Sequence, residues 1–290
     1  MNEKRLYSPA YVKEIIAKYR FRFSKSLGQN FLIDGNIVRK ICEEADITKE
    51  DEVLEVGPGI GTLTEELSLR AGKVVAVELD KNLLPILSDT LKVYENIEIV
   101  NGDILKLDLG SFLKEKFTSE KVKVVANLPY YITTPIIIKF LEEELNLDSI
   151  IVMVQKEVAE RMKAKPGIKD YGAFSVFVQY YTEPKIILDV PKTVFMPKPN
   201  VDSAVILLKV RKERIDLKNK ELFFKLVKAA FGKRRKTLLN SLSSSDLGLE
   251  KDQIRGILEK CNIDPNLRAE NLTIEDFAKV SSLLPPFNIY

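Results

Sequence analysis

The sequence predicts an α/β protein in which helices cover both faces of a mostly parallel sheet, followed by a smaller helical domain. Three observations predict this class. Runs rich in Val and Ile alternate with helix-length segments up to residue 155, as in parallel sheets that are buried on both faces. Beyond residue 212, helical patterns continue without a convincing strand. The length of 290 residues suits one large domain plus a small one.

The predicted elements of the first part follow in chain order. Five strands are expected at Val53–Gly57, Lys73–Glu78, Ile97–Asn101, Val122–Asn127 and Ser149–Gln155. The helices expected between them cover Thr62–Arg70, Lys81–Lys92 and Thr134–Glu144. Two more strands, Lys185–Val190 and Ala204–Val210, follow without a full helix between them, so we expect an antiparallel end to the sheet.

A domain boundary is predicted near residues 209–217, where the alternation ends. We assign residues 1–210 to the first domain, with residues 1–35 as its N-terminal segment, and residues 211–290 to the second. Helical patterns in the second domain cover Lys220–Leu242, Leu249–Cys261 and Thr273–Leu283. Thr273 stands three residues before Asp276, a spacing typical of a capping box at a helix start.

The composition excludes several classes of chemistry. The chain has no histidine and two cysteines, which excludes Ser-His and Cys-His mechanisms and His- or Cys-rich metal sites, so we expect no bound metal. The scarcity of cysteine fits a reducing cytoplasm. No apolar run approaches the ~20 residues of a membrane span, and the N-terminus lacks the apolar segment of a secretory signal. We therefore expect a cytoplasmic protein without a membrane partner.

The formal net charge of +3 averages over regions of opposite sign. Residues 1–25 carry seven basic and two acidic side chains, residues 26–208 carry 21 and 29, and residues 209–290 carry 17 and 11. An acidic middle therefore lies between two basic ends. Scattered charges usually reflect a solvated surface alone, so the distribution matters only where basic residues concentrate.

Two basic stretches stand out from this background. Residues 225–236 hold six Lys or Arg and no acid, and residues 161–169 combine basic side chains with the loop-breaking Pro166 and Gly167. A solvated face is the alternative interpretation of each stretch. The side chains that we expect to contact nucleic-acid phosphates are Arg161, Lys163, Lys165, Lys233, Arg234, Arg235 and Lys236.

The first motif with chemical content is the turn after the first predicted strand, which reads Val53-Leu-Glu-Val-Gly-Pro-Gly-Ile-Gly-Thr62. Glycines at a strand–helix turn let the backbone approach a ligand closely. Glu78 and Asp103 end the next two strands, where acids can accept hydrogen bonds from ribose hydroxyls and an adenine amine. Each acid alone is equally well explained as a helix cap or a surface acid. Together with the turn they favour a nucleoside pocket.

The spacing of Gly57, Gly59 and Gly61 discriminates between cofactors. Dinucleotide-binding proteins usually have G-x-G-x-x-G, whereas the third glycine here comes one residue early. With Glu55 the pattern becomes E-x-G-x-G-x-G, which resembles the signature of S-adenosylmethionine-dependent methyltransferases, in which the acid lies near the methionine amino group. Pro58 removes one N–H from the loop, which argues against a pyrophosphate cradle.

A second motif, Asn127-Leu128-Pro129-Tyr130, follows the fourth predicted strand. It resembles the N-P-P-Y motif of methyltransferases that act on exocyclic amines of nucleic-acid bases. Such an amine is a poor nucleophile because its lone pair is conjugated with the ring. The Asn127 side-chain carbonyl and the Leu128 main-chain carbonyl would accept its hydrogens, while Pro129 holds the latter in place and Tyr130 stacks on the base. A helix-capping turn is the alternative interpretation.

A second wall for an extruded base is predicted at Phe195. This residue begins the pattern F-x-P-x-P-x-V-D-S, whose prolines favour an extended loop before the last strand. A lone Phe at this place would more often belong to the core. Catalysis in this scheme depends on proximity and orientation toward a reactive sulfonium, and it needs no histidine.

Together these motifs resemble the ribosomal RNA adenine dimethyltransferase family, in particular its small-subunit, kasugamycin-sensitivity type. The resemblance runs nearly end to end and includes an N-terminal motif at 24–34 that closes over the cofactor. It implies a Rossmann-like domain with a seven-stranded sheet, and a C-terminal RNA-binding domain. The implied cofactor-binding residues are Gln29, Asn30, Leu32, Glu55, Gly57, Gly59, Gly61, Glu78, Asp103 and Asn127. The implied catalytic residues are Asn127, Leu128, Pro129, Tyr130 and Phe195.

The resemblance also implies a substrate: two adjacent adenosines in the 3′-terminal hairpin loop of 16S rRNA, each dimethylated in the assembling 30S subunit by an enzyme that we expect to be a monomer. The large-subunit, macrolide-resistance type is the nearest alternative, and Leu128 with the basic tail favours the small-subunit type. The early third glycine argues against an NAD-dependent oxidoreductase. Intact motifs argue against a non-catalytic RNA-binding assembly or transcription factor, and a small-molecule methyltransferase would leave the basic tail without a role.

Overall fold

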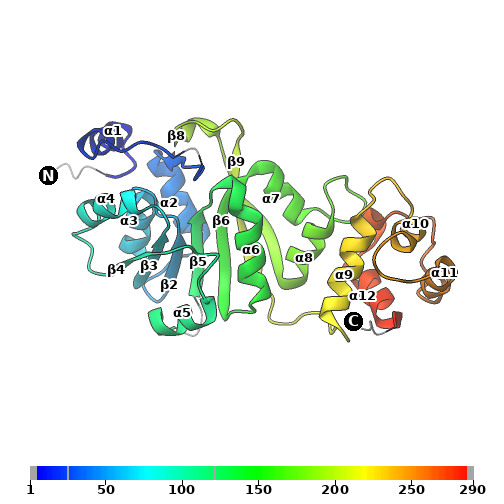
Figure 1. The fold of residues 1–290 in the computed structure, drawn as a ribbon. Helices are drawn as coiled ribbons and strands as arrows, with labels where there is room; N and C mark the ends of the chain where they lie inside the picture. Colours follow the sequence, from blue (N-terminus) through cyan, green and yellow to red (C-terminus); the bar gives the residue numbers. More distant parts are fainter. Residues whose placement is uncertain (1–4, 25, 120–121, 286–290) are drawn as a thin grey trace. The chain divides into compact units, whose positions relative to one another are not determined.

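The computed structural model describes residues 5–24, 26–119 and 122–285 (Figure 1). The chain divides into two compact units, Met1–Ala159 with Glu183–Val210, and Glu160–Thr182 with Arg211–Tyr290. Residues 1–4 and Lys25 of the predicted N-terminal segment lie outside the described residues. The units differ from the domains expected from the sequence in one segment: residues 160–182, expected in the first domain, group with the C-terminal helices.

The first unit is built on a seven-stranded sheet, as expected, with strand order β4-β3-β2-β5-β6-β9-β7. From β4 to β6 all neighbours pair in parallel, and β9 pairs antiparallel to β6. This confirms the mostly parallel sheet and its antiparallel end. The strands are β2 (Glu52–Val56), β3 (Lys73–Glu78), β4 (Ile97–Asn101), β5 (Val122–Asn127), β6 (Leu147–Gln155), β7 (Thr182–Val190) and β9 (Ser203–Val210).

Helices pack along this sheet, and a small second sheet lies in the same unit (Figure 1). In the small sheet, β1 (Phe31–Leu32) pairs antiparallel with β8 (Phe195–Met196). The helices are α1 (Pro9–Lys18), α2 (Gly35–Glu44), α3 (Thr62–Arg70), α4 (Leu84–Thr90), α5 (Leu109–Lys116), α6 (Thr133–Glu142) and α7 (Lys156–Lys163), which runs on into the second unit. Short 3₁₀ helices cover Lys81–Leu83, Tyr130–Ile132 and Lys192–Val194.

The central strands are apolar on both faces because both faces are covered. Leu54, Val75, Val124 and Ile150 are fully buried, which explains why these segments lack the alternation of a strand with one face in water. One exception is Glu55, the next-to-last residue of β2, a carboxylic acid that is 1% exposed. An acid at such a position needs a functional or electrostatic explanation.

The second unit is helical. Its helices are α8 (Ala173–Tyr181), α9 (Lys220–Phe231), α10 (Leu238–Ser243), α11 (Lys251–Lys260) and α12 (Ile274–Leu283), with a 3₁₀ helix at Ala269–Asn271. They enclose a core that includes Phe223, Leu258 and Phe277. The expected capping box is confirmed, because Thr273 and Asp276 exchange side-chain to backbone hydrogen bonds of 3.0 and 3.1 Å.

One helix predicted from the sequence is wrong in its extent. The pattern indicated a single helix over Lys220–Leu242, but α9 ends at Phe231 and α10 begins at Leu238. Gly232 caps the first helix, and the Thr237 side chain accepts a hydrogen bond from the Asn240 N–H to start the second. A glycine favours a helix end and a threonine favours a helix start. The basic residues 233–236 therefore lie in a turn.

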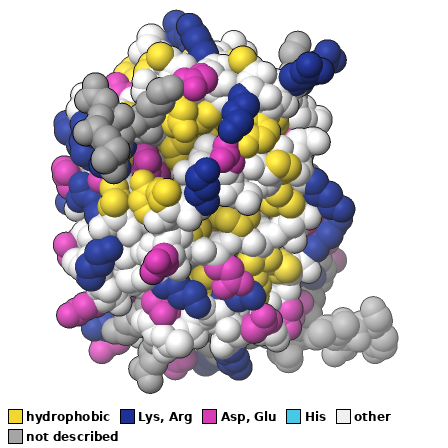
Figure 2. Space-filling view, turned by 90° about the vertical axis from the view of Figure 1, so that its left-hand side faces the viewer, with side chains coloured by type: hydrophobic (Ala, Val, Ile, Leu, Met, Phe, Trp, Pro, Cys, Tyr) yellow, Lys and Arg dark blue, Asp and Glu magenta, His cyan; other side chains and the backbone are white. Residues whose placement is uncertain are grey.

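The surface of the molecule carries charges of both signs. Figure 2 shows Lys and Arg side chains interspersed with Asp and Glu on one face, with apolar side chains gathered toward its middle. In the described part of the chain, no helix combines the length and the apolar character that crossing a membrane requires. In the same residues, no three His, Cys, Asp or Glu side chains are grouped so that they could hold a metal ion.

Candidate active site

A cavity opens at the carboxyl-terminal edge of the parallel sheet. Its empty volume, open mouth included, is about 1020 Å³. Its walls come from the turns after β2, β3, β4 and β5 and from the N-terminal residues 27–32. Because parallel strands all end at this edge, side chains far apart in sequence meet there. Of the expected cofactor-binding residues, those on the wall are Gln29, Asn30, Leu32, Glu55, Gly57, Gly59, Glu78, Asp103 and Asn127.

The glycine turn forms one wall because its backbone adopts conformations that favour glycine. Gly57, Gly59 and Gly61 have φ of +71°, +63° and +93°, in the left-handed region that side chains disfavour. A Cβ on Gly59 would approach the Phe31 ring to 3.1 Å. Gly61 differs from the expectation: it caps α3 and is not among the residues that line the cavity.

Glu55 and Glu78 bring two buried carboxyl groups to the cavity. In the described structure neither Oε2 of Glu55 nor the nearby Thr64 hydroxyl has a hydrogen-bond partner. Burial raises the pKa of Glu55 to about 8, and the Glu78 carboxylate adds to the shift. Burial also raises the pKa of Glu78 to about 7, although its carboxylate accepts hydrogen bonds from the Asp80 N–H at 2.7 Å and the Gly59 N–H at 3.3 Å.

The charge of the cavity is of one sign. Of the described residues that line it, three are acids, Glu55, Glu78 and Asp103, and none is Lys or Arg. A buried carboxylate is costly unless a positive charge or a donor compensates it. The site therefore favours a ligand that carries positive charge and hydrogen-bond donors, and it disfavours a phosphate or pyrophosphate group.

The turn after β5 presents the expected catalytic residues. Asn127, Leu128, Pro129 and Tyr130 all line the cavity. The Leu128 N–H donates to the Met153 carbonyl at 3.2 Å, and Pro129 has φ of −58°, so the backbone of this turn is fixed. The Tyr130 hydroxyl is hydrogen-bonded to Ser203 on β9 at 2.7 Å, which fixes the direction of the ring.

The N-terminal residues 26–32, which we call the strap, contribute residues 27–32 to the cavity wall and are held there by side-chain hydrogen bonds. The Asn127 side-chain N–H donates to the Asn30 carbonyl at 3.0 Å. The Gln29 side-chain N–H donates to the Asp80 carboxylate at 2.8 Å, and its oxygen accepts from the Ser24 N–H at 2.8 Å. The strap therefore contacts both the catalytic turn and the segment after β3.

Phe195 is the expected catalytic residue that the structure does not bring to the cavity. Its side chain is 4% exposed and belongs to a core cluster with Leu32, Val190 and Val205. Stacking on a base would require this ring to leave the core, so a stacking role for Phe195 stays a prediction.

The expected RNA-contacting side chains all belong to the second unit and are exposed. The Arg234 guanidinium donates to the Lys169 carbonyl, and the Gly167 N–H donates to the Glu270 carbonyl at 2.6 Å. The rings of Tyr171 and Phe231 also pack with centroids 5.8 Å apart. Within this unit the two basic stretches, far apart in sequence, therefore lie together.

Three residues at the site were not expected from the sequence. Asp80 holds Gln29, Ser203 holds Tyr130, and Tyr131 lines the cavity while 53% exposed. Asp80 follows Glu78 by two residues and Ser203 ends the V-D-S pattern, so both lie in motifs already recognised. Their partners, however, lie 51 and 73 residues away, a distance that local pattern does not report.

Comparison with known proteins gives the family. The model of the family described as "Ribosomal RNA adenine dimethylase" matches residues 20–285. The chain belongs to the ribosomal RNA adenine dimethylase family. It is 57% identical over 281 residues to "Ribosomal RNA small subunit methyltransferase A" of Clostridioides difficile, which covers 97% of each chain. It is 55% identical over 281 residues to the protein of that name from Alkaliphilus oremlandii, covering 97% of this chain and 98% of the other.

Two solved structures have the same fold. A dimethyladenosine transferase from Plasmodium falciparum matches with a TM-score of 0.74 at 27% identity, covering 86% of this chain and 95% of the other. The 23S rRNA methyltransferase ErmE matches with a TM-score of 0.66 at 26% identity, covering 88% and 99%. The large-subunit alternative is thus represented by a distant match at 26% identity. The sequence identity to the small-subunit relatives, 55% and 57%, is more than twice as high.

Membership in the dimethylase family makes this chain an S-adenosylmethionine-dependent rRNA methyltransferase. The cavity fits that cofactor on its own observations. The ammonium and sulfonium of S-adenosylmethionine are positive, and the wall offers Glu55 with a buried, unpartnered oxygen together with Glu78. Asp103 lies on the same wall, with its carboxylate accepting a hydrogen bond from the Leu105 N–H at 3.0 Å. The residues present therefore suit a cationic nucleoside.

Proposed function

We propose that this chain dimethylates the exocyclic amines of two adjacent adenosines in the 3′-terminal hairpin loop of 16S rRNA, within the assembling 30S subunit in the cytoplasm. The observation that carries the proposal is that the Asn127–Tyr130 turn lines the same cavity as the acids Glu55, Glu78 and Asp103. Family membership and the names of the small-subunit relatives support the choice of substrate. In this proposal the enzyme acts as a monomer.

The catalytic turn would act by orienting the amine. Bound S-adenosylmethionine supplies a methyl group on an electrophilic sulfonium. Asn127 offers its side-chain oxygen and Leu128 its main-chain carbonyl as acceptors for the amine hydrogens, which favours a pyramidal nitrogen with its lone pair toward the cofactor. Because the amide nitrogen of Asn127 already donates to Asn30, its oxygen is the atom left for substrate. Alignment of this kind contributes to rate without a general base.

Tyr130 would supply the face against which the base stacks. Its ring lines the cavity, and its hydroxyl is tied to Ser203. A fixed aromatic ring offers stacking energy without much loss of side-chain freedom. The Tyr130→Phe variant keeps the ring and loses the tie, so we expect it to retain more activity than Tyr130→Ala.

The second unit would hold the rRNA. Its exposed basic side chains at 161–165 and 233–236 lie together, as described above, and RNA affinity depends strongly on such phosphate contacts. This assignment gives a role to the basic tail that a small-molecule methyltransferase would leave unexplained. Its mechanism is electrostatic, so it predicts a steep dependence of RNA binding on salt.

The decisive experiment measures transfer of labelled methyl groups from S-adenosylmethionine. The acceptors are undermethylated 30S subunits, undermethylated 50S subunits and free 16S rRNA, and the modified bases are then mapped. We expect dimethylated adenosines in the 3′-terminal hairpin of the 30S acceptor and little transfer to the others. Methylation confined to the 50S acceptor would favour the large-subunit alternative, and no transfer to any RNA would refute the proposal.

A second experiment tests the RNA-binding surface with a matched control. Lys233, Arg235 and Lys236 are replaced by Gln, while Arg234 is kept because it bonds the Lys169 carbonyl. The control replaces three basic residues of α11 that are also exposed: Lys251, Arg255 and Lys260. We expect the test variant to weaken binding and to reduce the slope of log K against log salt by about 2. Equal effects in both variants would return residues 233–236 to an ordinary solvated surface.

A further inference from the structure

The side-chain amide of Asn127 is oriented by the strap. Its nitrogen lies 3.0 Å from the Asn30 main-chain oxygen. A carbonyl oxygen only accepts hydrogen bonds, so the atom that faces it must be the amide nitrogen and not the amide oxygen. The oxygen is thereby directed away from Asn30. Without this contact the amide could turn over and present two donors to an amine, which would remove the acceptor that the reaction requires.

The main chain next to the Asn30 carbonyl is anchored by the Gln29 side chain. Gln29 is adjacent to it in the chain, and the Gln29 side chain has both its polar atoms engaged, one with Ser24 and one with Asp80. Asp80 is 8% exposed, and its other oxygen accepts from the backbone and side-chain N–H groups of Asn82 at 3.0 and 2.8 Å. Both partners of the Gln29–Asp80 bond are thus fixed in direction.

Resting on the proposed function, we propose that Gln29 and Asp80 are positioning residues for catalysis: their hydrogen bond anchors the strap so that the Asn30 carbonyl turns the Asn127 amide oxygen toward the substrate amine. The strap then completes the acceptor geometry of the catalytic turn in addition to walling the cavity. The predicted contact of Gln29 with the cofactor is not required for this role. Asp80 gains a role in the reaction without touching the reacting atoms.

The donor and acceptor in this bond can be exchanged without changing the shape of either side chain. Asp80→Asn keeps the oxygen that accepts from Asn82 and places an amide nitrogen against the Gln29 nitrogen, so two donors face each other. Gln29→Glu keeps the oxygen that accepts from Ser24 and places a carboxylate oxygen against Asp80, so two acceptors face each other. The double variant restores one donor and one acceptor in the reverse order.

The experiment compares kcat, KM for 30S subunits and Kd for S-adenosylmethionine in these three variants. We expect each single variant to lower kcat about tenfold, with a smaller change in cofactor affinity, and the double variant to recover most of the loss. A double variant no more active than the worse single variant would overturn the proposal. A loss confined to cofactor affinity, with kcat unchanged, would also overturn it.

A coupling measurement separates positioning from general damage. In the Asn127→Ala background the orienting contact is absent, so adding Asp80→Asn should not lower the residual rate further. An undiminished tenfold effect in that background would show that Asp80 acts independently of Asn127 and would refute the proposal. If Asp80→Asn does not fold, Gln29→Leu, which removes the bond from the half-buried strap side, takes its place in the same comparison.

Matched controls use the same chemical changes away from the cavity. Asp108→Asn alters a helix-capping acid of α5, and Gln253→Glu alters the capping box of α11; thermal unfolding is recorded for every protein. Loss of kcat in these controls equal to that in the strap variants would contradict the proposal. A wild-type protein that methylates 30S subunits upholds the proposed function whatever the strap variants do, so the two failures are distinguishable.

Discussion

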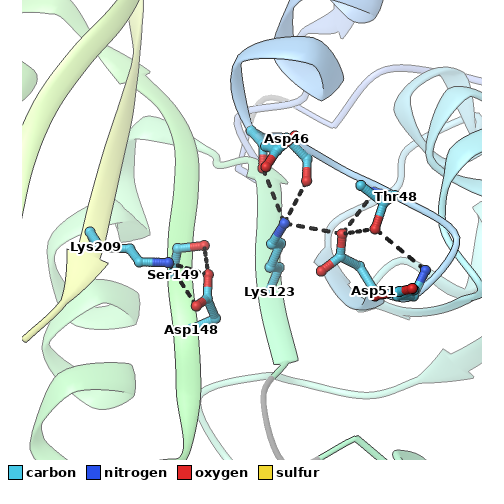
Figure 3. Close-up of polar contacts among 9 residues, drawn as sticks. Asp46, Thr48, Asp51, Lys123, Asp148, Ser149 and Lys209 are labelled. Carbon is cyan, nitrogen blue, oxygen red and sulfur yellow. Dashed lines mark hydrogen bonds and ion pairs between the residues drawn. The ribbon is translucent and has the colours of Figure 1, made fainter. Parts of the chain in front are cut away.

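The carboxyl-terminal and amino-terminal edges of the first unit's sheet differ in how their charged groups are paired. At the carboxyl-terminal edge, Glu55 and Glu78 are buried with raised pKa values, and an oxygen of Glu55 has no partner in the described structure. At the opposite edge, half-buried and exposed charges are paired. Figure 3 shows Lys123 directed at Asp46 and Asp51, and Lys209 at Asp148.

The amino-terminal edge is saturated with hydrogen bonds. The Lys123 ammonium reaches the Asp46 carbonyl at 2.6 Å and the Asp51 carboxylate at 3.0 Å, and Asp51 also accepts from Thr48. Glu52, at the start of β2, accepts from the N–H groups of Thr118 and Ser119 at 2.7 Å each, and although burial opposes it these bonds lower its pKa. Every one of these charges has a partner within the chain.

The difference shows where the molecule is built for stability and where for a ligand. Paired charges hold the ends of β2, β5 and α2 together and leave nothing for a ligand to complete. Unpaired buried acids cost stability, and a cationic ligand recovers that cost on binding. The contrast predicts that substitutions at the carboxyl-terminal edge mainly affect activity, whereas substitutions at the amino-terminal edge mainly affect stability.

The largest effect is expected at Asn127. Asn127→Ala removes an acceptor for the amine, so kcat should fall about a hundredfold or more, while S-adenosylmethionine binding stays close to that of the wild type. Single-turnover methyl transfer and calorimetric binding measure the two quantities. A variant with full activity would contradict the assigned role, and a fall in stability equal to that of a core substitution would remove the contrast between the edges.

Glu55→Gln is expected to weaken S-adenosylmethionine binding by roughly a hundredfold, because it removes the buried partner of a cation. In the wild type the pKa of about 8 means that the free protein holds a proton on Glu55 at neutral pH. A cation binds the ionised form, so affinity should rise as pH increases toward 8 and then level off. The variant should keep only the smaller rise contributed by Glu78, whose pKa is about 7, and calorimetry between pH 7 and 8 tests it.

Glu55→Gln should weaken cofactor binding but stabilise the ligand-free protein against unfolding. The folded pKa of Glu55 lies above its ordinary value of 4.5, so the folded state binds more protons than the unfolded state between pH 4.5 and about 8. The free energy of unfolding of the ligand-free wild type therefore falls as pH rises through this window. Glu55→Gln should be more stable than the wild type at pH 8 and closer to it at pH 5. The reverse order in urea unfolding would contradict this assignment.

The parallel sheet and much of the cavity wall could be predicted because they depend on local sequence. The runs Lys73–Glu78, Ile97–Asn101 and Val122–Asn127 were expected with the bounds that the structure has. Buried parallel strands are rich in apolar residues, and the half-buried edge strand β4 still has three Ile or Val residues. The glycine turn, Glu78 and Asp103 could be predicted as a group because ligands bind at the carboxyl ends of parallel strands. The functional roles of the individual site residues stay predictions.

What could not be predicted depends on tertiary contacts. Helix α8, with the sequence AFSVFVQYY, is rich in aromatic and β-branched residues that favour strands, and burial in the helical core decides its form. Phe195 occupies the core and not the cavity because β8 pairs with β1, where Phe195 lies opposite Leu32, 163 residues earlier in the chain. The Gln29–Asp80 and Tyr130–Ser203 bonds likewise join segments that no local pattern connects.

At the amino-terminal edge, Lys123→Met should lower the free energy of unfolding by about 1–3 kcal/mol. The Lys123 side chain is 13% exposed, and its removal leaves the carbonyl oxygens of Ala45 and Asp46 without this donor. Because the site lies at the other edge, kcat should change by less than about twofold. Urea unfolding and methyl transfer measure the two effects, and a large loss of kcat at unchanged stability would reverse the comparison.

The smallest effect is expected at Lys209→Met, which removes the two hydrogen bonds of 2.7 Å to Asp148. The Lys209 side chain is 51% exposed, so water replaces the lost partner and salt screens the pair. The free energy of unfolding should fall by less than about 1 kcal/mol, and the loss should shrink further in 0.5–1 M salt. If Lys209→Met lowered the free energy of unfolding at high salt as much as Lys123→Met does, exposure would not explain the difference between the two lysines.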